Sequence, residues 1–462
     1  MQATAHREIP FNSTSADDRQ LVESLLGPEV WTRLDGLRAR RVTGRSARLL
    51  LRFLGDVAIH RRNAFLLEEL VQSRERRNRL FRGASRDLDV VEGGANRHPE
   101  VLEVIAACRK LLADLRAEVA EAPARRRRIV GALGAIVGRE NVLLDPFTIV
   151  SHATDATDWR LHLPVAVVMP DREEQVAPLL AAIAELGLHA IPRGGGTGLT
   201  GGAIPLHPNC VVVNTEKLDR IRAIRTRAIP QADGGVLEAE VMEVEAGVVT
   251  ERAMEAAAER GLVFATDPTS AWACTIGGNI AENAGGKDCV LWGTCLDNLL
   301  AWRMAMPSGR SWTIARVAHP LRKILPDDHV RFEVRDEGGA VVRTVELRGD
   351  EIRRKGLWKD ITNKSLKGLP GVQKEGTDGV VTSAEFVLHR AWPATRTVCL
   401  EFFGPDFDEA SRVIVELSRA FPFPNDGRVA LLALEHFDDE YVRAIAYRVK
   451  SGRAETPRAV LL

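Results

Sequence analysis

The stretch IPRGGGTGLTGGAIP, residues 191–205, has six glycines within nine positions and threonine hydroxyls at Thr197 and Thr200. Glycine allows positive φ and lets a ligand approach the backbone without meeting a Cβ atom. Successive backbone N–H groups in such a loop can form a concavity that binds anions. A second segment of small residues, DPTSAWACTIGGNIAENAGG, occupies 267–286. Two such loops in one domain predict one large ligand that touches both.

Three interpretations of the first loop differ in what should follow it. Gly196, Gly198 and Gly201 have the G-x-G-x-x-G spacing of a Rossmann loop, which runs directly into a helix whose N-terminus holds a pyrophosphate. Here Pro205 and Pro208 follow, and no acidic residue ends a second strand about twenty positions later. A flexible linker does not sit between two buried strands. We therefore predict a rigid phosphate-binding loop between strands.

Residue periodicity predicts an α+β chain. Apolar residues three and four apart predict helices over 17–135, one of them stopped by Pro123. After 150, short apolar strands alternate with helices, and 330–351 is typical of a strand–turn–strand hairpin. At 462 residues the chain is longer than one domain usually is, so we expect two or three domains.

Composition narrows the classes of partner and location. Basic and acidic residues both number 63, and 45% of residues are hydrophobic, which is ordinary for a soluble globular protein. Residues 1–128 carry 25 basic against 18 acidic side chains, but without the interleaved aromatic residues that stack on bases, so we predict no nucleic-acid partner. No apolar run is long enough for a transmembrane segment. We expect a cytoplasmic protein, with peripheral attachment at the inner membrane as an alternative.

Four segments carry a resemblance to a known family: PRGGGTGLTGGAIP, DPTSAWACTIGGNIAENAGG, WGTCLDNLLAWRMAMPSG and EGTDGVVTSAEFVL. They resemble, in order, signatures of the FAD-linked oxidoreductases of the vanillyl-alcohol oxidase/PCMH superfamily, and most closely its D-lactate, D-2-hydroxyglutarate and glycolate dehydrogenases. The resemblance implies an α+β fold. It places a helical N-terminal extension at 1–135, a PCMH-type FAD-binding domain of two α/β subdomains at 140–393, and the start of an α+β cap domain, truncated, at 394–462.

The resemblance also implies which residues bind FAD. The first loop should wrap the pyrophosphate, and the second should lie along the ribityl chain and the isoalloxazine. The implied cofactor-binding residues are Pro192, Arg193, Gly194, Gly195, Gly196, Thr197, Gly198, Leu199, Gly201, Gly202, Asp267, Pro268, Thr269, Thr275, Gly277, Gly278, Asn279, Ala281, Asn283, Gly285, Gly286, Gly293, Val380 and Val381. Covalent attachment of FAD would use a histidine or a cysteine near these loops. Arg193, and not a histidine, stands beside the first loop, and Cys289 and Cys295 match no motif for covalent attachment. We therefore expect non-covalent FAD.

Oxidation of a 2-hydroxy acid needs a base for the hydroxyl proton and cations that hold the carboxylate. The segment WKDITNKSLKGLPGVQKEGTDG, 358–379, resembles the family stretch that runs up to the flavin, so Lys359 and Lys367 are catalytic candidates. An exposed loop charge is the alternative for both. The family's histidine motif, H-G-H-x-G-D-G-N-x-H, does not occur in this sequence. His389 and His436 each stand without a second histidine nearby. No metal site is predicted.

We expect an FAD-dependent dehydrogenase of a D-2-hydroxy acid, of D-lactate or D-2-hydroxyglutarate type, which passes electrons to an iron–sulfur centre or a quinone or cytochrome acceptor. The last residues, ETPRAVLL, are typical of a strand inside a domain. We therefore expect the N-terminal part of a larger FAD plus iron–sulfur fusion protein, with the cluster in further sequence or in a partner. The alternatives are an FAD oxidase of another alcohol and a catalytically incomplete FAD-binding module.

Overall fold

The computed structural model describes residues 18–40, 44–95, 98–157, 159–353, 363–404, 406–422 and 428–462. The chain divides into two compact units, Met1–Asn214 and Thr215–Leu462. The first holds the helical region and a small sheet, and the second holds a large antiparallel sheet and a smaller one. None of the described helices is long and apolar enough to cross a membrane. The predicted division at 1–135, 140–393 and 394–462 stays a prediction.

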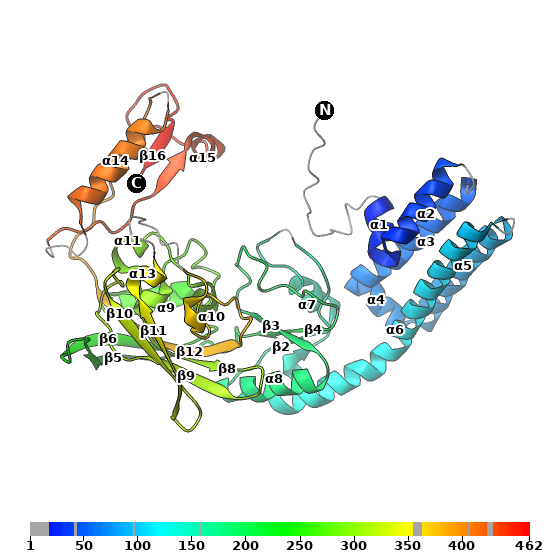
Figure 1. Cartoon of the computed structure of the whole chain (residues 1–462), viewed down its shortest axis with the longest axis horizontal. Helices are drawn as coiled ribbons and strands as arrows, with labels where there is room; N and C mark the ends of the chain where they lie inside the picture. The colour runs from blue at the N-terminus through cyan, green and yellow to red at the C-terminus, as the bar shows by residue number, and fades with distance from the viewer. Residues whose placement is uncertain are drawn as a thin grey trace. The chain divides into compact units, whose positions relative to one another are not determined.

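The predicted helical N-terminal region is confirmed. Its helices lie side by side (Figure 1). Their apolar faces form one core that includes Val22, Phe53, Leu88 and Leu115. Asn63 and Ser73 separate consecutive helices because each side chain accepts hydrogen bonds from backbone N–H groups of the helix that follows. The helices are α1 (Asp18–Leu26), α2 (Pro28–Ala39), α3 (Gly44–Arg62), α4 (Ala64–Gln72), α5 (Arg74–Gly93) and α6 (Pro99–Val137).

The prediction that Pro123 stops a helix is wrong. Helix α6 runs through Pro123 as one element of 39 residues and curves along its length (Figure 1). Proline removes one backbone donor and crowds the preceding turn, so a proline inside a helix bends it and costs about 3 kcal/mol. Buried residues on both sides of the bend, Val119 and Ile129, show that packing holds both halves of the helix in place.

Helix α6 and its neighbours also pack onto the first sheet. Arg125 of α6 donates from Nη2 to Oδ1 of Asn209, over 2.7 Å. Ala64, at the start of α4, shares an apolar cluster with Val167 and Val212 of the sheet. The helical region and this sheet therefore form one continuous unit.

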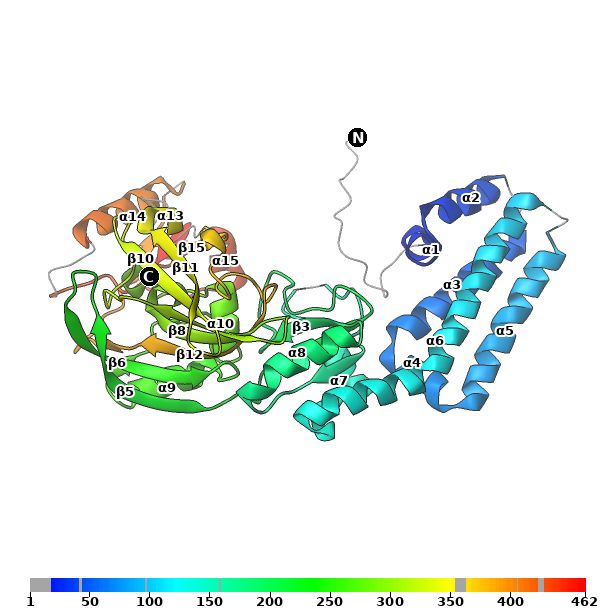
Figure 2. The same cartoon turned by 60° about the horizontal axis from the view of Figure 1, so that its bottom comes forward.

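The first sheet has the order β1-β2-β4-β3, formed by β1 (Val142–Leu143), β2 (Ala166–Val168), β3 (His189–Arg193) and β4 (Cys210–Asn214). Strands β2, β4 and β3 are parallel, and β1 is antiparallel to β2. Helix α7 (Pro146–Ser151) precedes β2, and α8 (Val176–Glu185) joins β2 to β3 and lies along one face of the sheet (Figure 2). Because β3 and β4 are parallel neighbours, the connection that contains the glycine loop must run from the carboxyl end of β3 back to the amino end of β4.

The second sheet has seven antiparallel strands in the order β11-β10-β9-β8-β12-β6-β5. Its strands are β5 (Ile221–Pro230), β6 (Val236–Glu245), β8 (Leu299–Ala305), β9 (Ser311–Arg316), β10 (His329–Arg335), β11 (Val341–Arg348) and β12 (Val380–Val387). The predicted hairpin at 330–351 is confirmed as β10 and β11, with Gly339 at φ +81° in its turn.

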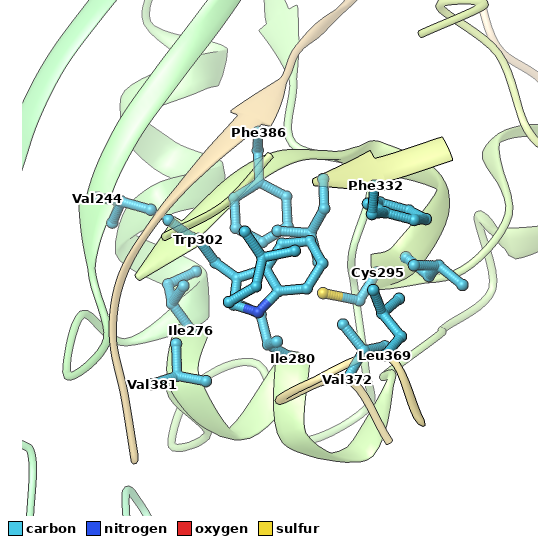
Figure 3. Close-up of a cluster of buried hydrophobic side chains, with 14 of the residues drawn as sticks. Val244, Ile276, Ile280, Cys295, Trp302, Phe332, Leu369, Val372, Val381 and Phe386 are labelled. Carbon is cyan, nitrogen blue, oxygen red and sulfur yellow. The ribbon is translucent and has the colours of Figure 1, made fainter. Parts of the chain in front are cut away.

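Short helices pack on this sheet: α9 (Thr250–Ala258), α10 (Ile276–Glu282), α12 (Cys295–Asn298) and α13 (Gly349–Ile352). A further short helix, α11 (Cys289–Trp292), packs against Val263 and Trp392 in a separate apolar cluster. Figure 3 shows Ile276 and Ile280 of α10 in the same apolar cluster as Trp302 of β8 and Phe386 of β12. The core of the second unit therefore fixes one side of α10.

The last part of the chain forms a separate three-stranded sheet with the order β14-β16-β15. Its elements are β14 (Leu400–Phe402), α14 (Asp408–Ala420), β15 (His436–Asp438), α15 (Asp439–Ala444) and β16 (Ala459–Leu461). A small core of its own contains Phe402, Ala410 and Leu461. One further strand pair, β7 (Leu262–Val263) with β13 (His389–Arg390), lies outside the two larger sheets. The predicted α+β class is confirmed.

Helix α6 should contribute to stability through its buried face. We expect Leu115→Ala to lower the free energy of unfolding by about 2–5 kcal/mol, because Leu115 is 0% exposed and a cavity remains. Leu102→Ala, on the same helix but 37% exposed, should cost much less. Urea unfolding followed by far-ultraviolet circular dichroism compares the two variants. Equal losses would contradict the packing described for α6.

Candidate functional site

The first glycine loop is an irregular connection with no helix between β3 and β4, which excludes a Rossmann arrangement. Gly196 and Gly201 have φ angles of +65° and +81°, which side-chain-bearing residues rarely adopt. A Cβ atom on Gly196 would overlap the Arg193 guanidinium, and one on Gly201 would lie 3.1 Å from the Trp159 ring. Both positions therefore need glycine for conformation and for space.

Arg193 braces this loop from within. Its Nη1 donates to the carbonyl oxygens of Thr154, at 2.7 Å, and Ala203, at 3.3 Å. These bonds tie the end of β3 to the far end of the loop. Among the other predicted residues here, Leu199 is 77% exposed, whereas Pro192, Gly194, Gly195, Thr197, Gly198 and Gly202 are half-buried. The structure thus assigns the Arg193 side chain to the loop's own shape.

In the second unit, α10 begins directly after Thr275 and approaches β6 very closely. Gly277 donates its backbone N–H to the carbonyl of Ala246 over 2.8 Å, and a Cβ on Gly277 would lie 2.9 Å from the Cβ of Ala246. Gly278, the next residue, faces open space, since a Cβ there would meet only the Thr275 hydroxyl, at 3.8 Å. The first turn of α10 thus packs on one side and exposes bare backbone on the other.

Two buried asparagines hold α10 in place. Asn279 donates from Nδ2 to the hydroxyl of Thr250 over 2.7 Å. Asn283 ends the helix in the left-handed conformation, and its Oδ1 accepts from the N–H of Leu296 over 2.9 Å. Both predicted cofactor contacts therefore use their side chains to position the helix, while half-buried Ala281 accepts from the N–H of Glu375.

Three further predicted glycines mark close backbone contacts. A Cβ on Gly286 would overlap the backbone and carboxylate of Asp267, and one on Gly285 would collide with the Cys289 sulfur. Gly293 has φ +77° and lies against Asp297. Pro268 and Thr269 follow Asp267 at the start of this segment, where Thr269 is exposed.

Two carboxyl groups, those of Asp267 and Asp288, lie close together where this segment begins and ends. The backbone N–H of Asp288 donates to Oδ1 of Asp267 over 3.2 Å, and Nζ of Lys287 lies 3.5 Å from the other oxygen. Burial, and then the charge of Asp267, raise the pKa of Asp288 from 3.8 to about 7. Burial also raises the pKa of Asp267. The Asp288 carboxyl group therefore stays protonated below about pH 7.

The segment 363–379 packs against the C-terminal end of α10 in an unusual backbone conformation. Gln373 and Glu375 donate their N–H groups to the carbonyls of Ile280 and Ala281, over 3.2 and 2.9 Å. Both residues have positive φ, as do Leu366 and Lys367. Such conformations cost about 1–2 kcal/mol each and gather at binding and active sites. Sequence periodicity gives no signal for them, so our sequence analysis missed this feature.

Several buried polar atoms around α10 have no hydrogen-bond partner among the described residues. They are Thr275 Oγ1, Asp288 Oδ1, Gln373 Oε1 and Asp378 Oδ1. A buried polar atom without a partner costs free energy unless a ligand or water satisfies it. Val380 and Val381, the last predicted contacts, begin β12 and pair with Ala305 and Met304.

The structure describes only one of the two predicted catalytic lysines. Lys359 lies outside the residues that the structure describes. Lys367 donates from Nζ to Oε2 of Glu351 over 2.7 Å, with half of its side chain exposed. The structure therefore brings Lys367 to a surface ion pair, and its catalytic role stays a prediction.

Known proteins resemble separate parts of this chain. Residues 164–315, which include both glycine-rich segments, match a family described as FAD binding domain. The chain contains an FAD-binding domain. Residues 4–117 match a family described only as a protein of unknown function (DUF3683).

Curated relatives support the same family. The glycolate oxidase subunit GlcD of Escherichia coli (strain K12) is 33% identical over 192 residues, covering 41% of this chain and 36% of the relative. The D-2-hydroxyglutarate dehydrogenase of Stutzerimonas stutzeri (strain A1501) is 26% identical over 335 residues, covering 70% and 57%. The chain thus spans less than two thirds of either relative.

A solved structure supports the fold. Alkyldihydroxyacetonephosphate synthase has a TM-score of 0.50 and 17% identity, covering 72% of this chain and 54% of that one. This likeness shows a shared fold, and together with the FAD-binding-domain match over 164–315 it supports the predicted PCMH-type FAD-binding fold.

The close contact at Gly286 should be intolerant of a side chain. We expect Gly286→Ala to destabilise the second unit by roughly 1–3 kcal/mol, because its Cβ meets backbone that cannot move aside. Gly278→Ala is the matched control, since open space surrounds that position and alanine favours a helix. Thermal unfolding of the two variants checks the difference. A Gly286→Ala protein as stable as Gly278→Ala would refute the contact.

The Asp267–Asp288 pair should make stability depend on pH. Folding raises the pKa of Asp288. Its contribution to the free energy of unfolding is therefore fully present below about pH 4 and is lost as the pH rises through about 7. We expect Asp288→Asn to stabilise the protein at pH 8, where it removes a buried charge beside Asp267. The gain should vanish near pH 4.5. Unfolding midpoints across this range test the sign, and a gain that is the same at both pH values would contradict it.

Proposed function

We propose that this chain is the FAD-binding part of a dehydrogenase that oxidises a D-2-hydroxy acid of D-lactate or D-2-hydroxyglutarate type. The observation that carries the proposal is the FAD-binding-domain match over 164–315, which spans both glycine-rich segments. The names of the relatives, glycolate oxidase subunit and D-2-hydroxyglutarate dehydrogenase, favour a small 2-hydroxy acid as substrate. Because the chain spans only part of these relatives, the activity remains our inference.

The residues present fit FAD. The loop after Arg193 offers backbone N–H groups unobstructed by Cβ atoms, which suits a pyrophosphate. Bare backbone at Gly278 and the unpartnered Thr275 hydroxyl suit the ribityl and isoalloxazine parts of the cofactor, as do the unpartnered oxygens of Gln373 and Asp378. When bound, FAD supplies the acceptor for the substrate hydride. The protein's contribution is to hold the cofactor and exclude water.

Non-covalent attachment is supported by the state of the nearby nucleophiles. The Cys289 sulfur is buried and accepts from the N–H of Gly286 over 2.9 Å. Cys295 is fully buried, and burial raises the pKa of its thiol well above the usual value. A thiol that stays protonated is a poor nucleophile for attack on a flavin.

Electrons would leave to an iron–sulfur centre or a quinone or cytochrome acceptor, held in a partner or in further sequence. We place the activity in the cytoplasm, with attachment at the inner membrane as the alternative. A second candidate function is an FAD-binding module without turnover. It is favoured by Lys367, whose ammonium already pairs with Glu351.

The visible spectrum of the purified chain tests the proposal first. We expect a flavin band near ~450 nm that moves entirely into the filtrate after denaturation. Anaerobic addition of D-lactate or D-2-hydroxyglutarate should bleach the band, and L-lactate should not. Flavin that binds but is never bleached would support the module instead. A colourless protein that takes up no added FAD would refute the proposal.

A further inference from the structure

A groove on the helical region carries an uncompensated positive charge. It has a volume of about 570 Å³ and is lined by Arg77, Asn78, Phe81, Arg82 and Arg116. The first four lie on α5, where Arg77 and Asn78 come one helical turn before Phe81 and Arg82. Arg116 faces them from α6. The groove is open to solvent, so a molecule bound there would keep part of its surface in water.

The three groove arginines differ from others in the same helices. Arg52, Arg61 and Arg109 each form an ion pair with an acidic side chain. No ion pair joins a groove arginine to a carboxylate in the part of the chain that the structure describes. None of the three has an acidic residue three or four positions away on its own helix. These neighbours are Ser73, Arg74, Leu80 and Phe81 for Arg77; Asn78, Arg79, Ser85 and Arg86 for Arg82; and Leu112, Ala113, Val119 and Ala120 for Arg116.

Backbone and hydroxyl oxygens hold these guanidinium groups without neutralising them. Arg77 donates from Nη1 to the carbonyls of Leu70 and Val71, over 3.1 and 3.2 Å. Arg116 donates from Nη2 to the Ser85 hydroxyl, over 2.9 Å, and to the Phe81 carbonyl, over 3.2 Å. Its guanidinium also lies 5.1 Å from the centre of the Phe81 ring. The charges of Arg77 and Arg116 are therefore held beside the groove before any ligand arrives.

We propose that this groove binds a small phosphorylated molecule. A phosphate monoester carries close to two negative charges and three acceptor oxygens, which matches three guanidinium groups better than a single carboxylate does. Arginine donors suit phosphate oxygens because their N–H groups form a planar fork. The groove exceeds the needs of inorganic phosphate, so the exposed Asn78 side chain can contact an organic part. The site is independent of the proposed flavin chemistry.

Titration calorimetry of the full chain, with FAD in excess, tests the proposal with phenyl phosphate as probe. We expect saturable binding that weakens as sodium chloride is raised, because charge drives it. Arg82→Gln should lower the affinity at least about tenfold, the equivalent of one charge-assisted hydrogen bond. Arg82 is suited to substitution because it is exposed and its Nε donates only to the Asn78 carbonyl of its own helix.

Arg86→Gln is the matched control, since it removes the same charge one turn further along α5, outside the groove lining. It should leave the affinity within about twofold of the original. Phenol and citrate test the need for phosphate. Absence of saturable binding, equal affinity in the two variants, or tighter binding of citrate than of phenyl phosphate would overturn the proposal.

Discussion

One buried carboxylate, that of Asp297, holds together the segments that frame the second half of the candidate site. Its oxygens accept from Arg353, from the N–H and hydroxyl of Thr294, and from the N–H of Ile324. Its backbone carbonyl accepts from Arg316 and His319. Burial alone would raise the pKa of Asp297, but these partners hold it below its usual value. Neither charge of the Asp297–Arg353 pair would be stable in this interior without the other.

Beyond this anchor, the candidate site depends on space left by missing side chains. Glycines allow α10 and its neighbours to approach the sheet and one another within a distance that a Cβ would prevent. The same region keeps five non-glycine residues at positive φ, Asn283 among them, and several buried oxygens without partners. Packing around Trp302 supplies the stability that sustains these local costs.

Helix α6 connects the two parts of the chain that match known families. It begins within the region that matches a family of unknown function and ends before the FAD-binding match. Through Arg125 it contacts Asn209, which directly precedes β4 and lies four residues after the first glycine loop. The helical region therefore helps to hold the start of β4, the strand that follows this loop.

The sequence by itself determined the features that depend on neighbouring residues: the amphipathic helices, the β10–β11 hairpin, and a glycine loop that no helix follows. Motif order also indicated the FAD-binding family. Only the tertiary structure decided that α6 continues through Pro123, because packing on both sides outweighs a local penalty. It likewise decided the pairing of Asp297 with Arg353, the positive φ angles near 366–375, and the ion pair of Lys367. Each of these depends on contacts between distant residues, which spacing along the chain does not encode.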